Sequence, residues 1–262
     1  PEAKFVDNLK DCDILFVSGV TLVSREIIDE AHKLGKKIVF RVDNIPRKSR
    51  NKRSRVYDNM RHFSHVADMV VFQSEWARNY AGLLTNAELG GSMVIYNGVD
   101  REIFYPAPEH ETDYKPLRYL FIQSQKNENK RFSEAAYMFH MAWRNDHNVS
   151  LTILGEFDSD LVSADFDFFA GENVEYLGTI PDRKTLAEVY RDHDVLLFPA
   201  FADAAPNTVL EARACGLLID GVNPVGGTKE LLADDLDISL DRMCQEYYSL
   251  DREVGTFNRR TG

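Results

Sequence analysis

Short apolar runs alternate with amphipathic stretches along the whole of this 262-residue chain. Such runs predict β-strands, and nearly uninterrupted ones are typical of parallel strands covered on both faces. The predicted strands are Ile14–Val17, Lys37–Val42, Met69–Phe72, Met93–Tyr96, Arg118–Ile122, Ser150–Leu154, Val174–Leu177 and Val195–Phe198. Helical patterns such as Ser24–Leu34 and Glu134–Arg144 lie between them. The alternation predicts an α/β fold built from doubly wound, Rossmann-like sheets.

A proline-rich segment divides the pattern in two. The stretch from Tyr105 to Pro116 contains three prolines and few apolar residues, so we expect it to be extended and exposed. We therefore predict a first domain over residues 1–106, a linker over 107–116 and a second domain over 117–262, with the two domains facing a ligand cleft. Only four strands precede the linker, and we expect the first domain to be incomplete, lacking its first strands, on the order of 100 residues.

Composition and charge narrow the class of protein. The chain carries a net charge of −11 and has a pI near 5.1, which excludes a protein that mainly coats nucleic acid. No apolar run approaches the ~20 residues that cross a bilayer, and the N-terminus does not resemble a signal peptide, so we expect a cytoplasmic protein. The three cysteines are widely spaced and predict neither a disulfide framework nor a zinc site.

The segment from Val195 to Leu232 holds the most informative polar residues. A buried-strand pattern ends at Pro199, a polar loop follows, and a helical pattern then runs to Gly216. The start of such a helix presents free backbone N–H groups and is an anion site, here at Pro206, Asn207, Thr208 and Val209. The carboxylates of Asp203 and Glu211 can accept hydrogen bonds from sugar hydroxyls. The alternative is a structural helix cap near Asn207 with a solvent-facing Glu211.

This segment resembles the donor-binding signature of the glycosyl transferases group 1, or glycosyltransferase family 4, which are retaining nucleotide-sugar enzymes of the GT-B fold. The matching residues are Pro199, Asp203, Glu211-Ala212, Ala214-Cys215-Gly216, Gly226-Gly227 and Glu230-Leu231. The resemblance extends to Tyr96–Asp100, to Asp68 with Ser74-Glu75, and to two strand ends at Gly155 and Gly178. Asp203 stands where the family has a Glu, which keeps the charge and shortens the reach.

The resemblance also implies a phosphate site after the first strand of the second domain. There the family carries an Arg and, five residues on, a Lys, which together neutralise the nucleotide diphosphate. Lys130 occupies the Lys position, but Gln125 replaces the Arg and supplies no charge. The adjacent Lys126 can compensate, and a solvated turn is the structural alternative.

Two features of the first domain are open to more than one interpretation. Many relatives carry a His after the strand equivalent to Lys37–Val42, where this chain has Asp43 and Asn44. Asp43 can orient a substrate hydroxyl or simply satisfy a strand-ending turn. The segment Arg47–Arg55 holds six cations in nine residues. It can be a solvated loop, a site for an anionic acceptor, or a peripheral membrane contact.

The resemblance implies transfer of a sugar from a nucleotide-sugar donor to a hydroxyl acceptor, which can be a glycan, a lipid-linked molecule or a small molecule. It implies Asp43, Lys130 and Asp203 as catalytic residues, and Gln125, Lys126, Lys130, Asp203, Pro206, Asn207, Thr208, Val209 and Glu211 as donor-binding residues. We expect no bound metal, because no Asp-X-Asp motif stands at the end of a predicted strand and no His/Cys cluster has the spacing of metal ligands. We expect no cofactor, because the nucleotide-sugar is a substrate. A non-catalytic nucleotide-sugar-binding subunit is the alternative, motivated by Gln125, Asp203 and the absent His. A related epimerase or phosphorylase is a third possibility.

Overall fold

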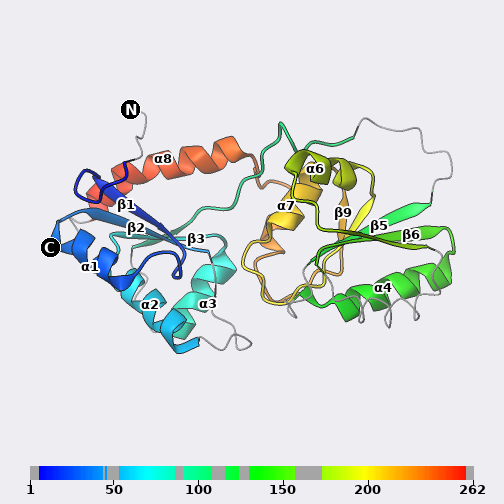
Figure 1. Ribbon diagram of the computed structural model, residues 1–262, viewed down its shortest axis with the longest axis horizontal. Coiled ribbons are helices and arrows are strands. Elements are labelled where there is room, and N and C mark those ends of the chain that lie inside the picture. The colour runs from blue at the N-terminus through cyan, green and yellow to red at the C-terminus, as the bar shows by residue number, and fades with distance from the viewer. Residues whose placement is uncertain are drawn as a thin grey trace. The chain divides into compact units, whose positions relative to one another are not determined.

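The computed structural model describes residues 6–43, 45, 53–85, 91–107, 116–123, 130–156 and 173–257. The chain separates into two compact units, Pro1–Tyr96 with Asp241–Gly262 and Asn97–Leu240 (Figure 1). Each unit is built on a parallel sheet of its own. The α/β class and the two Rossmann-like sheets expected from the hydrophobic pattern are confirmed.

The first unit contains a four-stranded parallel sheet in the order β1-β2-β3-β4. Helices α1, α2 and α3 lie on one face of this sheet and α8 on the other (Figure 1). Strand β3 is buried along its whole length, as its four apolar residues predict for a strand covered on both faces. The strands are β1 (Ile14–Ser18), β2 (Lys37–Val42), β3 (Met69–Phe72) and β4 (Ser92–Val94), and the helices are α1 (Arg25–Lys33), α2 (Arg53–Val66), α3 (Glu75–Thr85) and α8 (Leu240–Phe257).

Helix α8 belongs to the first unit although it comes last in the sequence. Its side chains Met243 and Tyr247 pack on a buried cluster that includes Val39 and Val71, and Tyr247 also meets Phe16 edge-on at 5.6 Å between ring centroids. Residues 97–106 pack with the second unit, where Phe104 lies fully buried against Tyr190. The grouping therefore differs at both ends from the boundaries 1–106 and 117–262, because these apolar contacts decide where each segment packs.

The second unit contains a five-stranded parallel sheet in the order β7-β6-β5-β8-β9. Helix α4 covers one face, and α6 and α7 lie on the other (Figure 1). The strands are β5 (Leu117–Ile122), β6 (Val149–Leu154), β7 (Val174–Gly178), β8 (Val195–Leu197) and β9 (Leu218–Asp220). The helices are α4 (Phe132–Asn145), α6 (Arg183–Arg191), α7 (Asn207–Ala214) and the short 3₁₀ helix η2 (Glu230–Leu232).

The strand order of this sheet indicates where a ligand would bind. From β5 the chain moves outward to β6 and β7, then returns to the other side of β5 to form β8. Ligands of open α/β sheets bind at the carboxyl ends of strands where the order reverses in this way. In this unit the reversal lies between β5 and β8.

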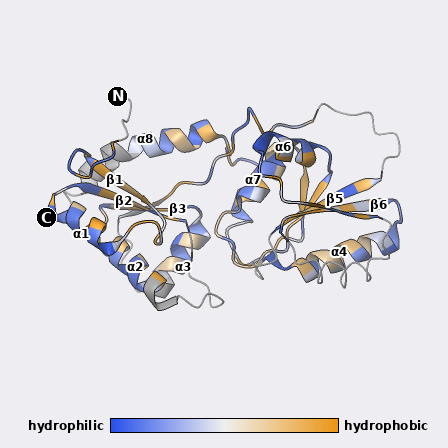
Figure 2. Ribbon diagram, viewed as in Figure 1, coloured by the Kyte–Doolittle hydropathy of each residue, from blue (hydrophilic) through white to orange (hydrophobic). Residues whose placement is uncertain are grey.

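The cores of both sheets are apolar, as the orange strands of Figure 2 show. In the second unit, Phe121 of β5, Leu151 and Ile153 of β6 and Phe139 of α4 form one buried cluster. This packing fixes the position of β5 in the sheet. Within the described residues, no helix combines the length and the apolar character that a membrane crossing requires.

Candidate functional site

The candidate site lies in the second unit, where the carboxyl ends of β5 and β8 meet. The segment after β5 leads to Lys130, directly before α4, and the loop after β8 leads through Asp203 to the start of α7. These are the two strands between which the sheet order reverses. The topology therefore brings together residues separated by more than 70 positions in the sequence.

Lys130 and Asp203 form an ion pair. The Lys130 ammonium donates to the Asp203 carboxylate at 2.8 Å, and each side chain is 18% exposed. The ammonium also lies 4.7 Å from the ring centroid of Phe198, within the range of a cation–π contact. Two of the three predicted catalytic residues are thus in direct contact, with their charges largely sheltered from water.

Backbone pairing holds Asp203 in place. The Gly227 N–H donates to the Asp203 carbonyl at 2.8 Å, and the Ala202 N–H donates to the Val225 carbonyl at 2.9 Å. Gly226 has a φ of +134°, and a Cβ atom there would lie 2.8 Å from the Asp203 carbonyl oxygen. A glycine is needed at this position, which accounts for the Gly226-Gly227 pair noted in the sequence.

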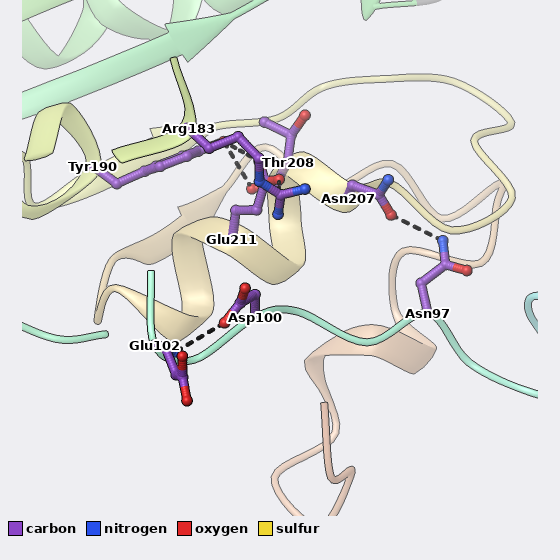
Figure 3. A network of polar contacts seen from close by, with 8 residues as sticks. All are labelled: Asn97, Asp100, Glu102, Arg183, Tyr190, Asn207, Thr208 and Glu211. Carbon is purple, nitrogen blue, oxygen red and sulfur yellow. Dashed lines mark hydrogen bonds and ion pairs between the residues drawn. The ribbon is translucent and has the colours of Figure 1, made fainter. Parts of the chain in front are cut away.

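The first turn of α7 supplies backbone N–H groups to the site. Pro206 is the N-cap and has no side chain that could cap the helix, while the Val209 N–H donates to the Pro206 carbonyl at 3.1 Å. The Asn97 side-chain amide donates to the Asn207 side-chain oxygen at 2.9 Å (Figure 3). The same amide donates to the Ala205 carbonyl at 3.2 Å. Asn97 therefore fixes the approach to the helix start. Asn207 is the first helical residue, not the cap.

Glu211 lies one turn further along α7 and has two partners from α6. The Tyr190 hydroxyl donates to Glu211 Oε2 at 3.1 Å, and an Arg183 nitrogen lies 3.9 Å from Oε1 (Figure 3). Burial raises the pKa of the Glu211 carboxyl, against the opposing effects of Tyr190 and Arg183. The Glu211 side chain is only 18% exposed, which excludes the solvent-facing alternative.

Asp43 lies in the first unit, directly after β2. Its carboxylate packs on Gly19, where a Cβ atom would lie 2.5 and 2.6 Å from the two carboxylate oxygens. Gly19 has a φ of +85°, and its N–H donates to the Arg41 carbonyl at 3.0 Å. Asp43 thus rests on a glycine turn that leaves room for its side chain.

Some predicted site residues lie outside the part of the chain that the structure describes. Gln125 and Lys126 lie outside the described residues, as does Asn44. Of the basic segment Arg47–Arg55, residues 47–52 also lie outside them, and Arg53 begins α2. Their predicted roles stay predictions.

Three residues of the site were not identified from the sequence. Tyr190 and Arg183 occupy positions that the amphipathic pattern of α6 explains equally well by packing and solvation. Asn97 was noted only within the matching Tyr96–Asp100 stretch. The fold alone brings them to α7. Among the residues that the structure describes, no group of three or more His, Cys, Asp or Glu side chains is arranged to hold a metal ion.

Comparison with known proteins adds a family match and a set of similar folds. The sequence profile described as "Glycosyl transferases group 1" matches residues 108–238. No curated protein sequence matches the chain. HepE of Anabaena, solved with UDP and glucose, superposes with a TM-score of 0.64 at 14% identity, over 88% of this chain and 64% of HepE. Sucrose-phosphate synthase of Thermosynechococcus elongatus superposes with a TM-score of 0.61 at 15% identity, over 84% of this chain and 58% of that enzyme.

These structural likenesses show the fold. The chain spans less than two thirds of the length of both proteins. The matched range 108–238 includes Lys130, Asp203 and Glu211, and it also contains both strands whose carboxyl ends border the site.

Proposed function

Because the chain belongs to the glycosyl transferases group 1 and has the GT-B fold, we propose that it transfers a sugar from a nucleotide-sugar donor to a hydroxyl acceptor. The observation that carries this proposal is the meeting of Lys130, Asp203 and the start of α7 at the strand reversal between β5 and β8. A cation and helix-start N–H groups suit a phosphate, and the nearby carboxylates suit hydroxyls. A nucleotide-sugar combines both kinds of group.

Each residue has a definite role in this proposal. Lys130, with Lys126 and Gln125, faces the diphosphate, and the backbone of Pro206, Asn207, Thr208 and Val209 binds phosphate and sugar. Asp203 accepts from the sugar hydroxyls, and Glu211 accepts from the ribose. Asp43 orients a hydroxyl of the donor or acceptor. HepE, which shares the fold, was solved with UDP-glucose, which supports a donor of this class.

We propose that the chemistry proceeds without a resident metal and with retention of the anomeric configuration. Departure of the nucleoside diphosphate places negative charge on the β-phosphate, and fixed positive groups near that charge lower the barrier. Lys130 is held at the site by an ion pair and an aromatic ring. These two contacts keep the Lys130 ammonium at the strand reversal, where the diphosphate is proposed to bind.

The acceptor side of the proposal rests on the basic segment Arg47–Arg55. Six cations in nine residues favour an anionic acceptor or the surface of an anionic membrane over a neutral small molecule. The acceptor is then a glycan or a lipid-linked molecule, and the contact with the membrane is peripheral.

A non-catalytic nucleotide-sugar-binding subunit is the second candidate. The observation that favours it is the engagement of Lys130 with Asp203, together with the neutral Gln125 at a position where relatives carry a cation. Such a subunit would bind a nucleotide-sugar and never turn it over. Measurement of donor hydrolysis and transfer separates the two candidates.

The experiment that tests the proposal is calorimetric titration with UDP-, GDP- and ADP-sugars. For the tightest of these, Glu211→Ala is expected to weaken binding by about 1.5–3 kcal/mol, because a buried ribose loses its charged acceptor. Glu188→Ala is the matched control, since Glu188 is an exposed carboxylate on α6. Equal affinity of folded Glu211→Ala and wild type would remove Glu211 from the site, and absence of binding to all three donors would overturn the proposed function.

A further inference from the structure

We propose that Tyr190 is a positioning residue for Glu211, whose hydroxyl fixes one carboxylate oxygen so that the other is presented to the ribose hydroxyls. This inference rests on the proposed function, since it assigns the ribose to Glu211. It adds a residue that neither the sequence pattern nor the family match identifies. Tyr190 comes from α6, an element that bears none of the predicted site residues.

The ring of Tyr190 is held rigidly. The residue is 1% exposed, and its ring meets the fully buried Phe104 edge-on at 6.0 Å between centroids. A buried aromatic side chain of this kind has little rotamer freedom. The hydroxyl at its tip is therefore placed by the core of the unit and not by solvent.

The hydroxyl has two acceptors within reach. Glu211 Oε2 lies at 3.1 Å and the Thr208 carbonyl oxygen at 3.4 Å (Figure 3). A phenol carries a single proton, and a carboxylate is a stronger acceptor than a peptide carbonyl. The proton therefore lies toward Glu211, and Oε2 is engaged before any ligand arrives.

The other oxygen of Glu211 has a weaker neighbour. Arg183 lies 3.9 Å from Oε1, beyond hydrogen-bond distance, and its side chain is 58% exposed. Its guanidinium lies over the Phe104 ring at 5.2 Å from the centroid. Arg183 supplies a screened positive potential, while Tyr190 supplies the directed bond, so Oε1 is the oxygen left to accept from the ribose.

The same bond keeps Glu211 in the acceptor form. Burial raises the pKa of Glu211, and the Tyr190 hydrogen bond followed by the Arg183 charge lowers it. Cys215, the C-cap of α7, also interacts electrostatically with Glu211, and burial raises the pKa of Cys215 to about 11, so it is a neutral thiol near pH 7. Burial and the Glu211 charge raise the pKa of Tyr190 well above its ordinary value, so Tyr190 remains a donor throughout the working range of pH.

The test is Tyr190→Phe, which keeps the ring against Phe104 and removes only the hydroxyl. Binding of UDP, GDP and ADP is measured by calorimetry between pH 5.5 and 8.5. For the diphosphate that binds wild type best, we expect Tyr190→Phe to weaken binding roughly tenfold near pH 7, as for loss of a hydrogen bond to a charged group. The loss should be largest at low pH, where Glu211 without Tyr190 takes up a proton, and should shrink as pH rises.

Two variants separate this role from a structural one. Tyr176→Phe is the matched control, because the Tyr176 hydroxyl donates to the Gly155 carbonyl at 2.6 Å in the same unit. It is expected to bind as wild type does. In a Glu211→Gln background, Tyr190→Phe should cause little further loss, whereas a packing defect would add its full cost. A pH-independent loss that persists in the Glu211→Gln background would overturn the inference.

A measurement without ligand makes the inference independent of the proposed function. Titration of the Glu211 carboxyl by NMR should give a higher pKa in Tyr190→Phe than in wild type. An unchanged pKa would overturn the positioning role, whatever the protein binds. If Glu211→Ala loses binding while Tyr190→Phe binds as wild type at every pH, the inference fails and the proposed function stands.

Discussion

The ion pair between Lys130 and Asp203 gives a prediction in which stability and ligand affinity change in opposite directions. Asp203→Asn keeps the size of the side chain and removes its charge. Lys130 then keeps its place over Phe198 but loses its anionic partner. We expect the variant to be less stable, to bind a nucleoside diphosphate more tightly, and to transfer sugar more slowly.

The size of each effect follows from the geometry. At 2.8 Å the two charges attract by about 6 kcal/mol with an effective dielectric constant of about 20, before the cost of desolvation is subtracted. Exposed pairs contribute about 0–1 kcal/mol net, and loss of one partner of a fully buried pair costs about 3–5 kcal/mol. Each side chain here is 18% exposed, so we expect a loss of about 1–2 kcal/mol in the free energy of unfolding.

The gain in affinity has a different origin. In wild type, a diphosphate that approaches Lys130 competes with the Asp203 carboxylate for the same ammonium and is repelled by it. Removal of that carboxylate should tighten binding of UDP alone about tenfold, which corresponds to about 1.4 kcal/mol. A nucleotide-sugar gains less, because its sugar hydroxyls lose their charged acceptor.

Calorimetry with UDP and UDP-glucose, thermal unfolding and a transfer assay measure the three effects on the same preparation. Asp194→Asn is the matched control, because Asp194 pairs with Arg118 at 3.4 Å directly before β8, at the opposite end of that strand. It should lower stability slightly and leave UDP affinity unchanged. If Asp203→Asn weakens UDP and UDP-glucose equally, the ion pair does not compete with the diphosphate and the reasoning is refuted.

Three further predictions test other parts of the site. Lys130→Ala should reduce kcat more than it weakens donor binding, because the proposed function places Lys130 beside charge that develops in the transition state. Steady-state kinetics and calorimetry measure the two effects, and equal losses in kcat and in donor affinity would contradict this role. Glu211→Gln should unfold at a higher temperature than wild type near pH 7, because burial raises the pKa of Glu211 and ionisation of its carboxyl lowers stability as pH rises through that pKa. Below about pH 4.5 the Glu211 carboxyl is protonated in both the folded and the unfolded protein, so the difference in unfolding temperature should vanish. An equal difference at both pH values would show that ionisation of Glu211 is not its cause. Replacement of Arg50, Lys52 and Arg53 by Ser should leave donor binding intact and lower salt-sensitive acceptor turnover or liposome sedimentation, whereas unchanged salt profiles would make the segment a solvated connector.

The hydrophobic pattern predicted strands well where packing covers both faces. Strand β6 is an example, since most of its residues are buried and its apolar run is nearly continuous. Strand β9 was not predicted, because it has only three residues and its Leu218 is 71% exposed. Its position is set by pairing with β8, a non-local contact that leaves no periodic signal.

The packing of the last helix could not be predicted from its own residues. Met243 and Tyr247 indicate an apolar face, but a face does not specify which of two sheets it covers. The proline-rich segment marked a real break in the hydrophobic pattern. It did not reveal that the chain returns to the first sheet after completing the second.

The motif spacing identified Lys130, Asp203 and Glu211 separately, but their partners depend on the fold. The ion pair joins residues 73 positions apart, through the ends of two adjacent strands. The Tyr190 hydroxyl reaches Glu211 only because α6 packs beside α7 with the Tyr190 ring buried. A buried Tyr in an amphipathic helix has no sequence signal that distinguishes a core residue from one that orients a carboxylate.

The two carboxylates of the site have partners of different kinds, and this difference suits the two ends of one ligand. Asp203 is paired with a cation, so the pair as a whole carries no net charge toward an incoming diphosphate. Glu211 is bonded to a neutral hydroxyl and retains its acceptor capacity. Glu211 lies four positions after Asn207 in α7, a rise of about 6 Å, which is the scale of a ribose next to a phosphate. A ligand with phosphate at the strand reversal and hydroxyls one helical turn away therefore meets complementary groups at both ends. A phosphate compound without hydroxyls would leave only Oε2 of Glu211 bonded, to Tyr190, and would make no use of Oε1.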